Sequence, residues 1–206
     1  MILMDCLQGS PEWHAARLGI PTASAFSRIL SPKSLKLSES SQSYMHELLA
    51  ERMLGFPLES ASSDFMERGK ALEDQAMAYY ELQRGVDTER VGFALTDDRR
   101  AGCSPDRLVG TEGGLEIKCP SPAVHVGYLL DGLPAKFLPQ VQGCLWITGR
   151  AWWDLLSYHA DLPVALVRVS RDPEYIGALE AAVTAFCDRL ESASEKLMQS
   201  TSAATR

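Results

Sequence analysis

The sequence lacks several features that would place a protein in a simple class. Its cysteines are few, odd in number and nowhere in Cys-x-x-Cys spacing: Cys6, Cys103, Cys119, Cys144 and Cys187. This pattern argues against a disulfide framework and against a zinc or iron–sulfur site. No stretch approaches the roughly 20 apolar residues that a membrane span needs. The first residues also lack the basic segment of a signal peptide. We therefore expect a soluble cytoplasmic protein, with reduced thiols and no membrane partner.

Positive charge is also scarce. Twenty Lys and Arg stand against 27 Asp and Glu, which gives a formal net charge of −7. A protein that simply coats nucleic acid is usually basic, so any contact with nucleic acid must rely on local positive charge. The acidic surplus then lies elsewhere on the surface or holds divalent cations.

The 206 residues are 46% hydrophobic and 23% charged, which is typical of a globular chain. We expect one domain, residues 1–206. Periodicity predicts helices from Pro11 to Gly19, after Thr22, and over about 42–54, 64–84, 122–131, 139–148 and 172–197. Alternation predicts strands over 91–96, 101–109, 114–119, 152–158 and 165–170. This order predicts an α/β fold with a central mixed sheet flanked by helices.

The same patterns give more local expectations. On the helix over 42–54, the inward residues are expected to be Tyr44, Leu48 and Met53. The last helix carries an apolar stripe that reaches Leu197. The Ser-rich end, residues 199–206, is expected to be frayed.

One predicted hairpin combines charge with apolar surroundings. Alternation places Glu116 and Lys118 on one face of their strand. A turn centred near Thr111 places Asp106 opposite Glu116. Two facing carboxylates repel unless a cation lies between them, and either Lys118 or a divalent metal would serve. The alternative is a solvated hairpin face with a salt bridge, but the small and apolar neighbours favour a buried site.

A further carboxylate lies on the helix over 64–84. Glu73 shares a face with Met66, Gly69, Ala76, Met77 and Tyr80. An acid on such a face needs a partner, which a metal or Lys118 would provide. The alternative is a surface Glu paired with Lys70. Oxygen ligands beside one lysine are typical of Mg²⁺ or Mn²⁺ and of phosphodiester hydrolysis.

Asp106, nine further residues and Glu116–Ile117–Lys118 resemble the PD-(D/E)xK nuclease motif, with Pro105 as its proline. Other motifs follow along the chain: Trp13–His14 with Arg17–Leu18–Gly19, Thr22–Ala23–Ser24, Gly69–Lys70 with Glu73, Cys103–Ser104, Leu115 with Cys119–Pro120, and Gln140–Val141–Gln142 with Trp146. Together they resemble the lambda exonuclease (YqaJ-type) family of phage recombination nucleases. The resemblance covers about residues 8–190.

This resemblance implies a restriction-endonuclease-like core and a Mg²⁺-dependent 5′→3′ exonuclease, with two ions expected and Mn²⁺ as a substitute. Such an enzyme digests one strand of duplex DNA to mononucleotides and leaves a 3′ overhang for recombination by single-strand annealing. The implied partners are duplex ends, a phage annealing protein and two further copies in a ring-shaped trimer. A ring allows a basic lumen beneath an acidic exterior. The implied location is the cytoplasm of a bacterial host.

The resemblance also implies roles for single residues. Asp106, Glu116 and the carbonyl of Ile117 match metal ligands, Glu73 matches an acid that helps to hold metal or water, and Lys118 matches the catalytic lysine. The residues that match the pocket for a 5′-terminal phosphate are Arg17, Ser24, Ser104 and Gln140. Where the family has a second phosphate-binding arginine, this sequence has Val124, which leaves dependence on a 5′ phosphate open.

Two alternatives stay open. One is a structure-specific or restriction-like endonuclease on the same core, which would cut closed circular DNA. The other is a non-catalytic DNA-binding adaptor, although Asp106, Glu116 and Lys118 are all present.

Overall fold

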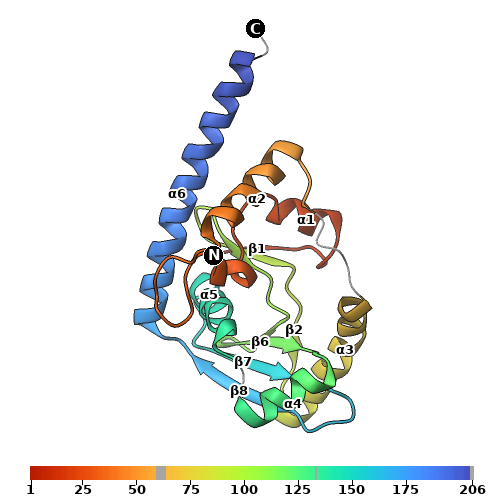
Figure 1. The fold of residues 1–206 in the computed structure, drawn as a ribbon. Helices are drawn as coiled ribbons and strands as arrows, with labels where there is room; N and C mark the ends of the chain where they lie inside the picture. Colours follow the sequence, from red (N-terminus) through yellow and green to blue (C-terminus); the bar gives the residue numbers. More distant parts are fainter. Residues whose placement is uncertain (59–63, 133, 205–206) are drawn as a thin grey trace.

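Two β-sheets lie side by side in the computed structural model, which describes residues 1–58, 64–132 and 134–204 (Figure 1). The strands are β1 (Ile2–Met4), β2 (Thr88–Glu89), β3 (Phe93–Leu95), β4 (Gly102–Cys103), β5 (Arg107–Val109), β6 (Gly113–Lys118), β7 (Trp152–Ser157) and β8 (Ala165–Ser170). The helices are α1 (Pro11–Arg17), η1 (Ala23–Arg28), α2 (Ser41–Leu54), α3 (Asp64–Arg84), α4 (Pro122–Asp131), η2 (Ala135–Phe137), α5 (Leu138–Thr148) and α6 (Pro173–Ala204).

The larger sheet is mixed, as predicted. Its strand order is β2-β5-β6-β7-β8. Strands β6 and β7 run parallel, while the other neighbours are antiparallel. A parallel pair needs a crossover, and the segment with α4, η2 and α5 provides it. The smaller sheet is antiparallel, in the order β1-β3-β4.

The prediction of one strand over 101–109 is wrong in one respect: the segment forms two strands that belong to different sheets. Its first part, β4, pairs with β3, and its second part, β5, pairs with β6. The break falls at Pro105, whose missing N–H prevents it from donating to a ladder. Asp106 therefore lies in the link between the two sheets.

Local signals place most helix ends where the sequence predicts them. The hydroxyl of Ser10 accepts a hydrogen bond from the N–H of Trp13 and caps α1. Gly55 and Gly85 follow α2 and α3 with φ of +75° and +62°, a conformation that glycine adopts without a steric cost. The bounds of α3 coincide with the predicted range of 64–84.

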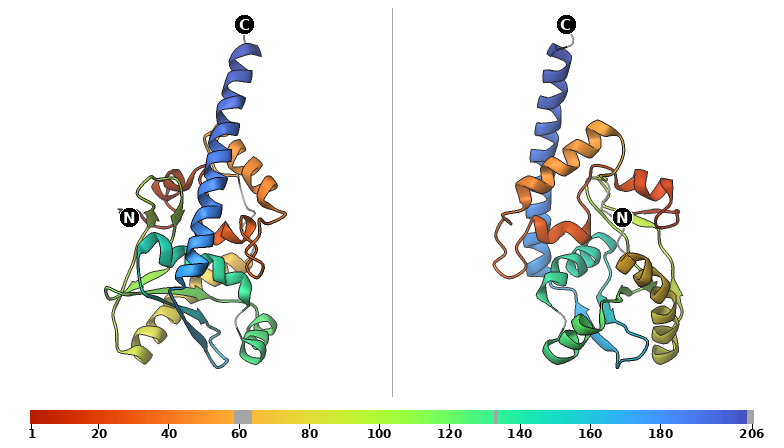
Figure 2. Two further views of the ribbon diagram at one scale, coloured as in Figure 1. Left: turned by 90° about the vertical axis from the view of Figure 1, so that its left-hand side faces the viewer. Right: turned by 45° about the vertical axis from the view of Figure 1, so that its right-hand side comes forward.

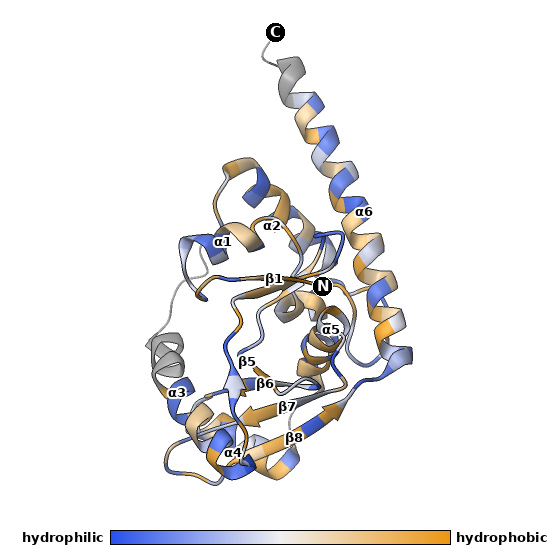
Figure 3. Cartoon of the chain, turned by 180° about the vertical axis from the view of Figure 1, so that it is seen from behind, coloured by the Kyte–Doolittle hydropathy of each residue, from blue (hydrophilic) through white to orange (hydrophobic). Residues whose placement is uncertain are grey.

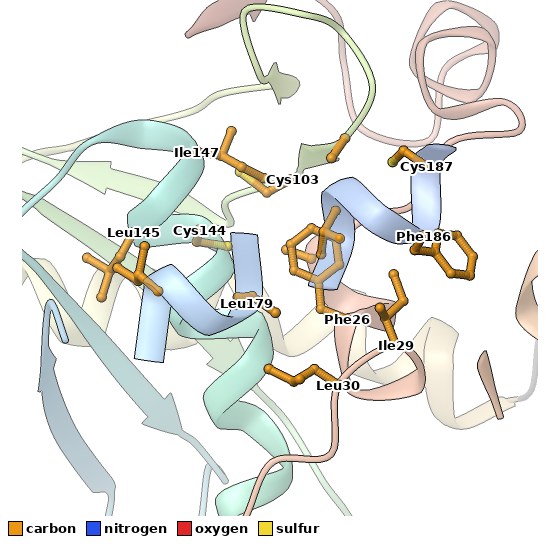
Figure 4. Packing of buried hydrophobic residues seen from close by; sticks show 14 of the residues in the cluster. Phe26, Ile29, Leu30, Cys103, Cys144, Leu145, Ile147, Leu179, Phe186 and Cys187 are labelled. Atoms are coloured by element: carbon orange, nitrogen blue, oxygen red, sulfur yellow. The ribbon is translucent and has the colours of Figure 1, made fainter. Parts of the chain in front are cut away.

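The main core lies where η1, α2, α5 and α6 meet the sheets. Figure 4 shows Phe26 of η1 in one apolar cluster with Leu179 and Phe186 of α6. The helix α5 approaches η1 closely because Gly143 has no side chain. A Cβ there would lie 2.6 Å from the ring of Phe26. A second cluster packs α3 against the larger sheet through Ala76, Tyr80, Val109, Leu115, Ile117 and Leu156.

The end of α2 departs from the expected burial. Met53 is 60% exposed, contrary to the prediction that it faces inward, and Leu197 is 37% exposed. Both residues line a shallow groove of about 240 Å³ between α2 and α6. At this level α2 and α6 extend beyond the two sheets (Figure 1).

The helix α6 is longer than predicted. It continues to Ala204 and projects past the rest of the molecule, with the C-terminus at its far end (Figures 1 and 2). The prediction that residues 199–206 are frayed is therefore wrong for 199–204, while 205–206 lie outside the described residues. The sequence has no Gly or Pro after Gly177 that would end the helix.

Hydrophilic and hydrophobic residues alternate along α6, as on a helix buried on one side only (Figure 3). Among the helices of the described residues, none is long and apolar enough to cross a membrane.

A buried carboxylate ties the larger sheet to α3. Asp154 of β7 is fully buried and accepts hydrogen bonds from the hydroxyl of Tyr80 at 2.7 Å and from Nε of Arg168 at 2.8 Å. The guanidinium of Arg168 also lies 3.5 Å above the ring of Trp152. These bonds satisfy a carboxylate that would otherwise be costly to bury.

We expect Asp154→Ala to lower the free energy of unfolding by about 2–4 kcal/mol, because the buried hydroxyl of Tyr80 loses its acceptor. Urea and thermal unfolding would measure the loss, with a fall in Tm of about 5–15 °C. Asp74→Ala is the control, since its side chain is 69% exposed and its two ion pairs, with Arg90 and Arg107, contribute little. A loss for Asp154→Ala no larger than for this control would contradict the expectation.

Candidate active site

The two carboxylates of the predicted hairpin face each other. Strands β5 and β6 pair Arg107 with Leu115, so the next position along the ladder places Asp106 opposite Glu116, as the spacing predicts. One oxygen of Asp106 accepts a hydrogen bond from the backbone N–H of Ile117 at 2.5 Å. Although Asp106 lies outside a regular strand, β6 therefore fixes the position of its carboxylate.

Glu116 is 3% exposed and its two oxygens differ. Its Oε1 accepts hydrogen bonds from Nζ of Lys118 and from the amide of Gln140, each at 2.6 Å. Its Oε2 is buried and has no hydrogen-bond partner among the described residues. An unsatisfied carboxylate oxygen is costly in a protein interior. A divalent cation at this oxygen would remove that cost.

The pKa values of Asp106 and Lys118 are both raised in this environment. Burial, and then the charge of Glu116, raise the pKa of Asp106 well above its usual range. Burial alone would lower the pKa of Lys118, but the charges of Glu116 and Asp106 outweigh it, and that pKa is raised. Asp106 therefore resists ionisation without a cation, whereas Lys118 retains its proton.

Glu73 is half-buried on α3, and its charge adds to the rise in the pKa of Asp106. It also contributes, after burial, to raising the pKa of Cys119 to about 11. Among the described residues, no three His, Cys, Asp or Glu side chains form a group that would hold a metal ion. Direct ligation by Glu73 therefore stays a prediction. Met66 and Gly69 belong to the predicted face, and Lys70 is the alternative partner of Glu73. The side chains at these positions lie outside the described part of the structure.

The donors that fit a metal at this site are the carboxylates of Asp106 and Glu116, with the backbone carbonyl of Ile117 in the strand between Glu116 and Lys118. All are oxygen atoms, which suit Mg²⁺ and Mn²⁺ rather than a softer ion. The unsatisfied oxygen of Glu116 supports this fit.

A second group of predicted residues meets beside the hairpin. Nη1 of Arg17 donates to the hydroxyl of Ser104 at 2.9 Å, and the indole N–H of Trp13 donates to the same oxygen at 3.0 Å. The guanidinium lies 4.0 Å from the ring centre of Trp13. Within the described part of the chain, no carboxylate forms an ion pair with Arg17, so its charge remains available for an anion.

Arg17 and Ser24 line one cavity of about 510 Å³ between α1, η1 and α2. The structure therefore brings together Arg17, Ser104 and Ser24, as the resemblance implies. It places the fourth residue of that set, Gln140, on the carboxylate of Glu116 instead. Val124 is 44% exposed on α4 and offers no charge to a phosphate.

Sequence reasoning missed two roles in this region. The bond from Gln140 to Glu116 joins residues 24 positions apart, and no local pattern predicts it. The packing of Trp13 against Arg17 could have been predicted from the sequence, because residues at i and i+4 are neighbours on a helix.

The model of the YqaJ-like viral recombinase domain matches residues 12–151, which include the hairpin, Arg17 and Gln140. The chain belongs to this family. The YqaJ-like chain also superposes on the alkaline exonuclease LHK-Exo from Laribacter hongkongensis with a TM-score of 0.86 and 34% identity, over 95% of this chain and 100% of that one. LHK-Exo has also been solved in complex with dAMP.

A phage-related exonuclease from Haemophilus somnus 129PT matches with a TM-score of 0.68 and 17% identity, over 86% of this chain and 96% of that one, and shares the fold. No match was found among curated protein sequences. These comparisons confirm the resemblance and the PD-(D/E)xK fold class. The YqaJ-like protein is a nuclease, with a DNA exonuclease role in recombination.

Proposed function

We propose that the protein is a Mg²⁺-dependent 5′→3′ exonuclease on duplex DNA, which releases 5′-mononucleotides and leaves a 3′ overhang. The observation that carries the proposal is the buried, unsatisfied Oε2 of Glu116, opposite Asp106 and beside Lys118. Carboxylates that need a cation and a lysine that keeps its proton are the parts that phosphodiester hydrolysis requires.

In this proposal Asp106, Glu116 and the carbonyl of Ile117 hold the metal, with Glu73 assisting at one of two ions. The metal supplies Lewis-acid stabilisation of the phosphate and makes water more acidic. Gln140 fixes the orientation of Glu116 through Oε1. Because its pKa is raised, Lys118 acts as an ammonium donor that orients the attacking water and offsets the charge that develops on the phosphate.

Arg17, Ser104 and Ser24 would hold the 5′-terminal phosphate, because guanidinium and hydroxyl groups are donors to phosphate oxygens. The complex of LHK-Exo with dAMP, a nucleoside monophosphate like the proposed products, supports a site that accepts such a group. Since Val124 stands where the family has a second arginine, the preference for a phosphorylated end rests on Arg17.

The proposed partners follow from the family. They are duplex DNA ends, a phage single-strand annealing protein and two further copies in a ring-shaped trimer, within the bacterial cytoplasm. A ring reconciles the net charge of −7 with DNA binding, because the lumen can be basic while the outside is acidic. Light scattering tests the trimer, which would have three times the chain mass of 22.6 kDa.

The decisive experiment uses a linear duplex with one labelled, phosphorylated 5′ end beside a closed circular DNA, each with and without Mg²⁺. Early release of labelled mononucleotide, only with metal and only from the linear DNA, is expected. A cut circle would replace the proposal with an endonuclease. Release of the 5′ label only after the rest of the labelled strand has been digested would reverse the polarity.

We expect Arg17→Ala to slow digestion of 5′-phosphorylated ends about 10- to 100-fold and to leave 5′-hydroxyl ends unaffected, because a charge-assisted hydrogen bond is lost. Initial rates on the two ends measure this preference. Arg90→Ala, which removes a side chain that is 65% exposed, serves as the control. An equal loss on both ends would mean that Arg17 supports the fold rather than the phosphate.

A further inference from the structure

An aromatic side chain stands beside the candidate lysine. The ring centre of Phe137, in η2, lies 5.4 Å from Nζ of Lys118 and 5.1 Å from Nζ of Lys136. Phe137 is half-buried, so the residue keeps partial contact with solvent. No function described above uses this ring.

One ring contact and the place of Phe137 in the chain position its side chain. Tyr128 of α4 meets it edge to face, with ring centres 6.1 Å apart and an interplanar angle of 86°. Phe137 also lies three residues before Gln140, whose amide donates to Glu116. The ring therefore lies at the end of η2, directly before the helix α5 that carries Gln140 to the carboxylate.

A nucleobase of the DNA substrate is a chemically suitable ligand for the ring of Phe137. If Lys118 acts on the scissile phosphate, the groups within reach of its ammonium include the bases on either side of that phosphate, each one sugar away. A base that leaves the end of a duplex loses its stacking partner. An aromatic ring replaces that partner, and it accepts all four bases because each has a π face.

We propose that Phe137 is a stacking surface for a nucleobase that flanks the scissile phosphate, with Tyr128 supporting the ring. This inference rests on the proposed function, because it needs Lys118 to act at the phosphate. It adds a base-binding site that tolerates any sequence, as an enzyme that digests arbitrary DNA requires. Lys136, exposed beside the ring, supplies charge for the neighbouring backbone.

The alternative role of Phe137 is to support the ammonium of Lys118 through a cation–π contact. The two roles differ in their dependence on the base. Loss of a stacking surface matters only when a base is present, whereas a misplaced Lys118 slows hydrolysis of every substrate equally.

The test therefore combines Phe137→Ala with abasic DNA. Three linear duplexes carry the same phosphorylated 5′ end. The first has a base at both of the two terminal positions. The second has an abasic site at the first position, and the third has an abasic site at the second position. With the parent enzyme, one abasic site is expected to slow single-turnover release about 10-fold or more. Phe137→Ala is expected to slow release from intact DNA by a similar factor and to lose the sensitivity to that abasic site.

Phe137→Leu keeps an apolar side chain without a ring and is expected to behave like Phe137→Ala, whereas Phe137→Trp should keep the parent's sensitivity. Leu130→Ala, which truncates a side chain that is 79% exposed on α4, is the control and should also keep it. Equal slowing of all three duplexes by Phe137→Ala and Phe137→Leu would overturn the inference and favour support of Lys118.

A binding measurement separates this inference from the proposed function. A duplex with 2-aminopurine at its first or second position, bound without metal, is expected to change its fluorescence with the parent and not with Phe137→Leu. The same fluorescence with both proteins would overturn the inference even if the parent digests DNA. A parent that quenches 2-aminopurine but releases no nucleotide in Mg²⁺ or Mn²⁺ would support the base site and overturn the proposed function.

Discussion

Lys118→Ala is expected to lower the rate of DNA hydrolysis about 1,000-fold while DNA affinity changes only a few-fold. The ammonium lies beside the carboxylates, and its raised pKa keeps it charged at neutral pH. A positioned donor of this kind stabilises charge that exists only in the transition state. Its removal should therefore reduce the rate constant for hydrolysis far more than binding.

Single-turnover rates and fluorescence anisotropy with the same labelled duplex would separate these two quantities. Lys196→Ala, which removes an exposed ammonium on α6, should change neither. Activity of Lys118→Ala within a few-fold of the parent would remove Lys118 from the mechanism. A parallel loss of binding and rate would assign it to the DNA contact alone.

Asp106→Asn is expected to abolish activity, by about 1,000-fold or more, and to make the metal-free protein more stable by about 1–2 kcal/mol. The buried carboxylate faces Glu116, and its raised pKa shows that ionisation is unfavourable there. The amide removes the charge, while its oxygen can still accept the hydrogen bond from the N–H of Ile117. The carboxylate therefore serves metal binding at the expense of stability.

The pH dependence follows from the direction of that shift. A carboxyl group whose pKa is raised in the folded protein stabilises the fold fully below its unfolded pKa of about 3.9. This contribution is lost as the pH rises through the folded value. The metal-free parent should thus lose stability from about pH 4 upward to that raised pKa, and Asp106→Asn should lack this part of the dependence.

Thermal unfolding at pH 5 and pH 8, with and without Mn²⁺, would measure both effects. At pH 8 without metal, Asp106→Asn should unfold about 2–8 °C above the parent, and Mn²⁺ should raise the Tm of the parent alone. Asp131→Asn, exposed on α4, is the control. A metal-free Asp106→Asn that is less stable than the parent would contradict the proposed repulsion, and unchanged Mn²⁺ affinity would contradict the proposed ligand.

The sequence predicts the parts of this fold that depend on neighbouring residues. The bounds of α3 follow from a helical pattern and from Gly85, and the pairing of Asp106 with Glu116 follows from counting outward from one turn. Both depend on local geometry, which periodicity and turn residues record.

Long-range contacts are beyond such reasoning. The bond from Arg17 to Ser104 spans 87 positions, and the approach of the Phe137 ring in η2 to Lys118 in β6 likewise joins two separate elements. Two errors have the same cause. Met53 has the spacing of a core residue but lies past the sheets, and β4 and β5 form one continuous pattern but join different sheets.

The division of that strand at Pro105 has a consequence for product length. The smaller sheet ends next to Ser104, which binds Arg17, and the larger sheet carries Glu116 and Lys118. Under the proposed function, the spacing between the anchor of the 5′ phosphate and the point of cleavage is then set by a link of three residues, Ser104, Pro105 and Asp106, between the two sheets. Because so short a link keeps this spacing constant, the enzyme should release one nucleotide at a time.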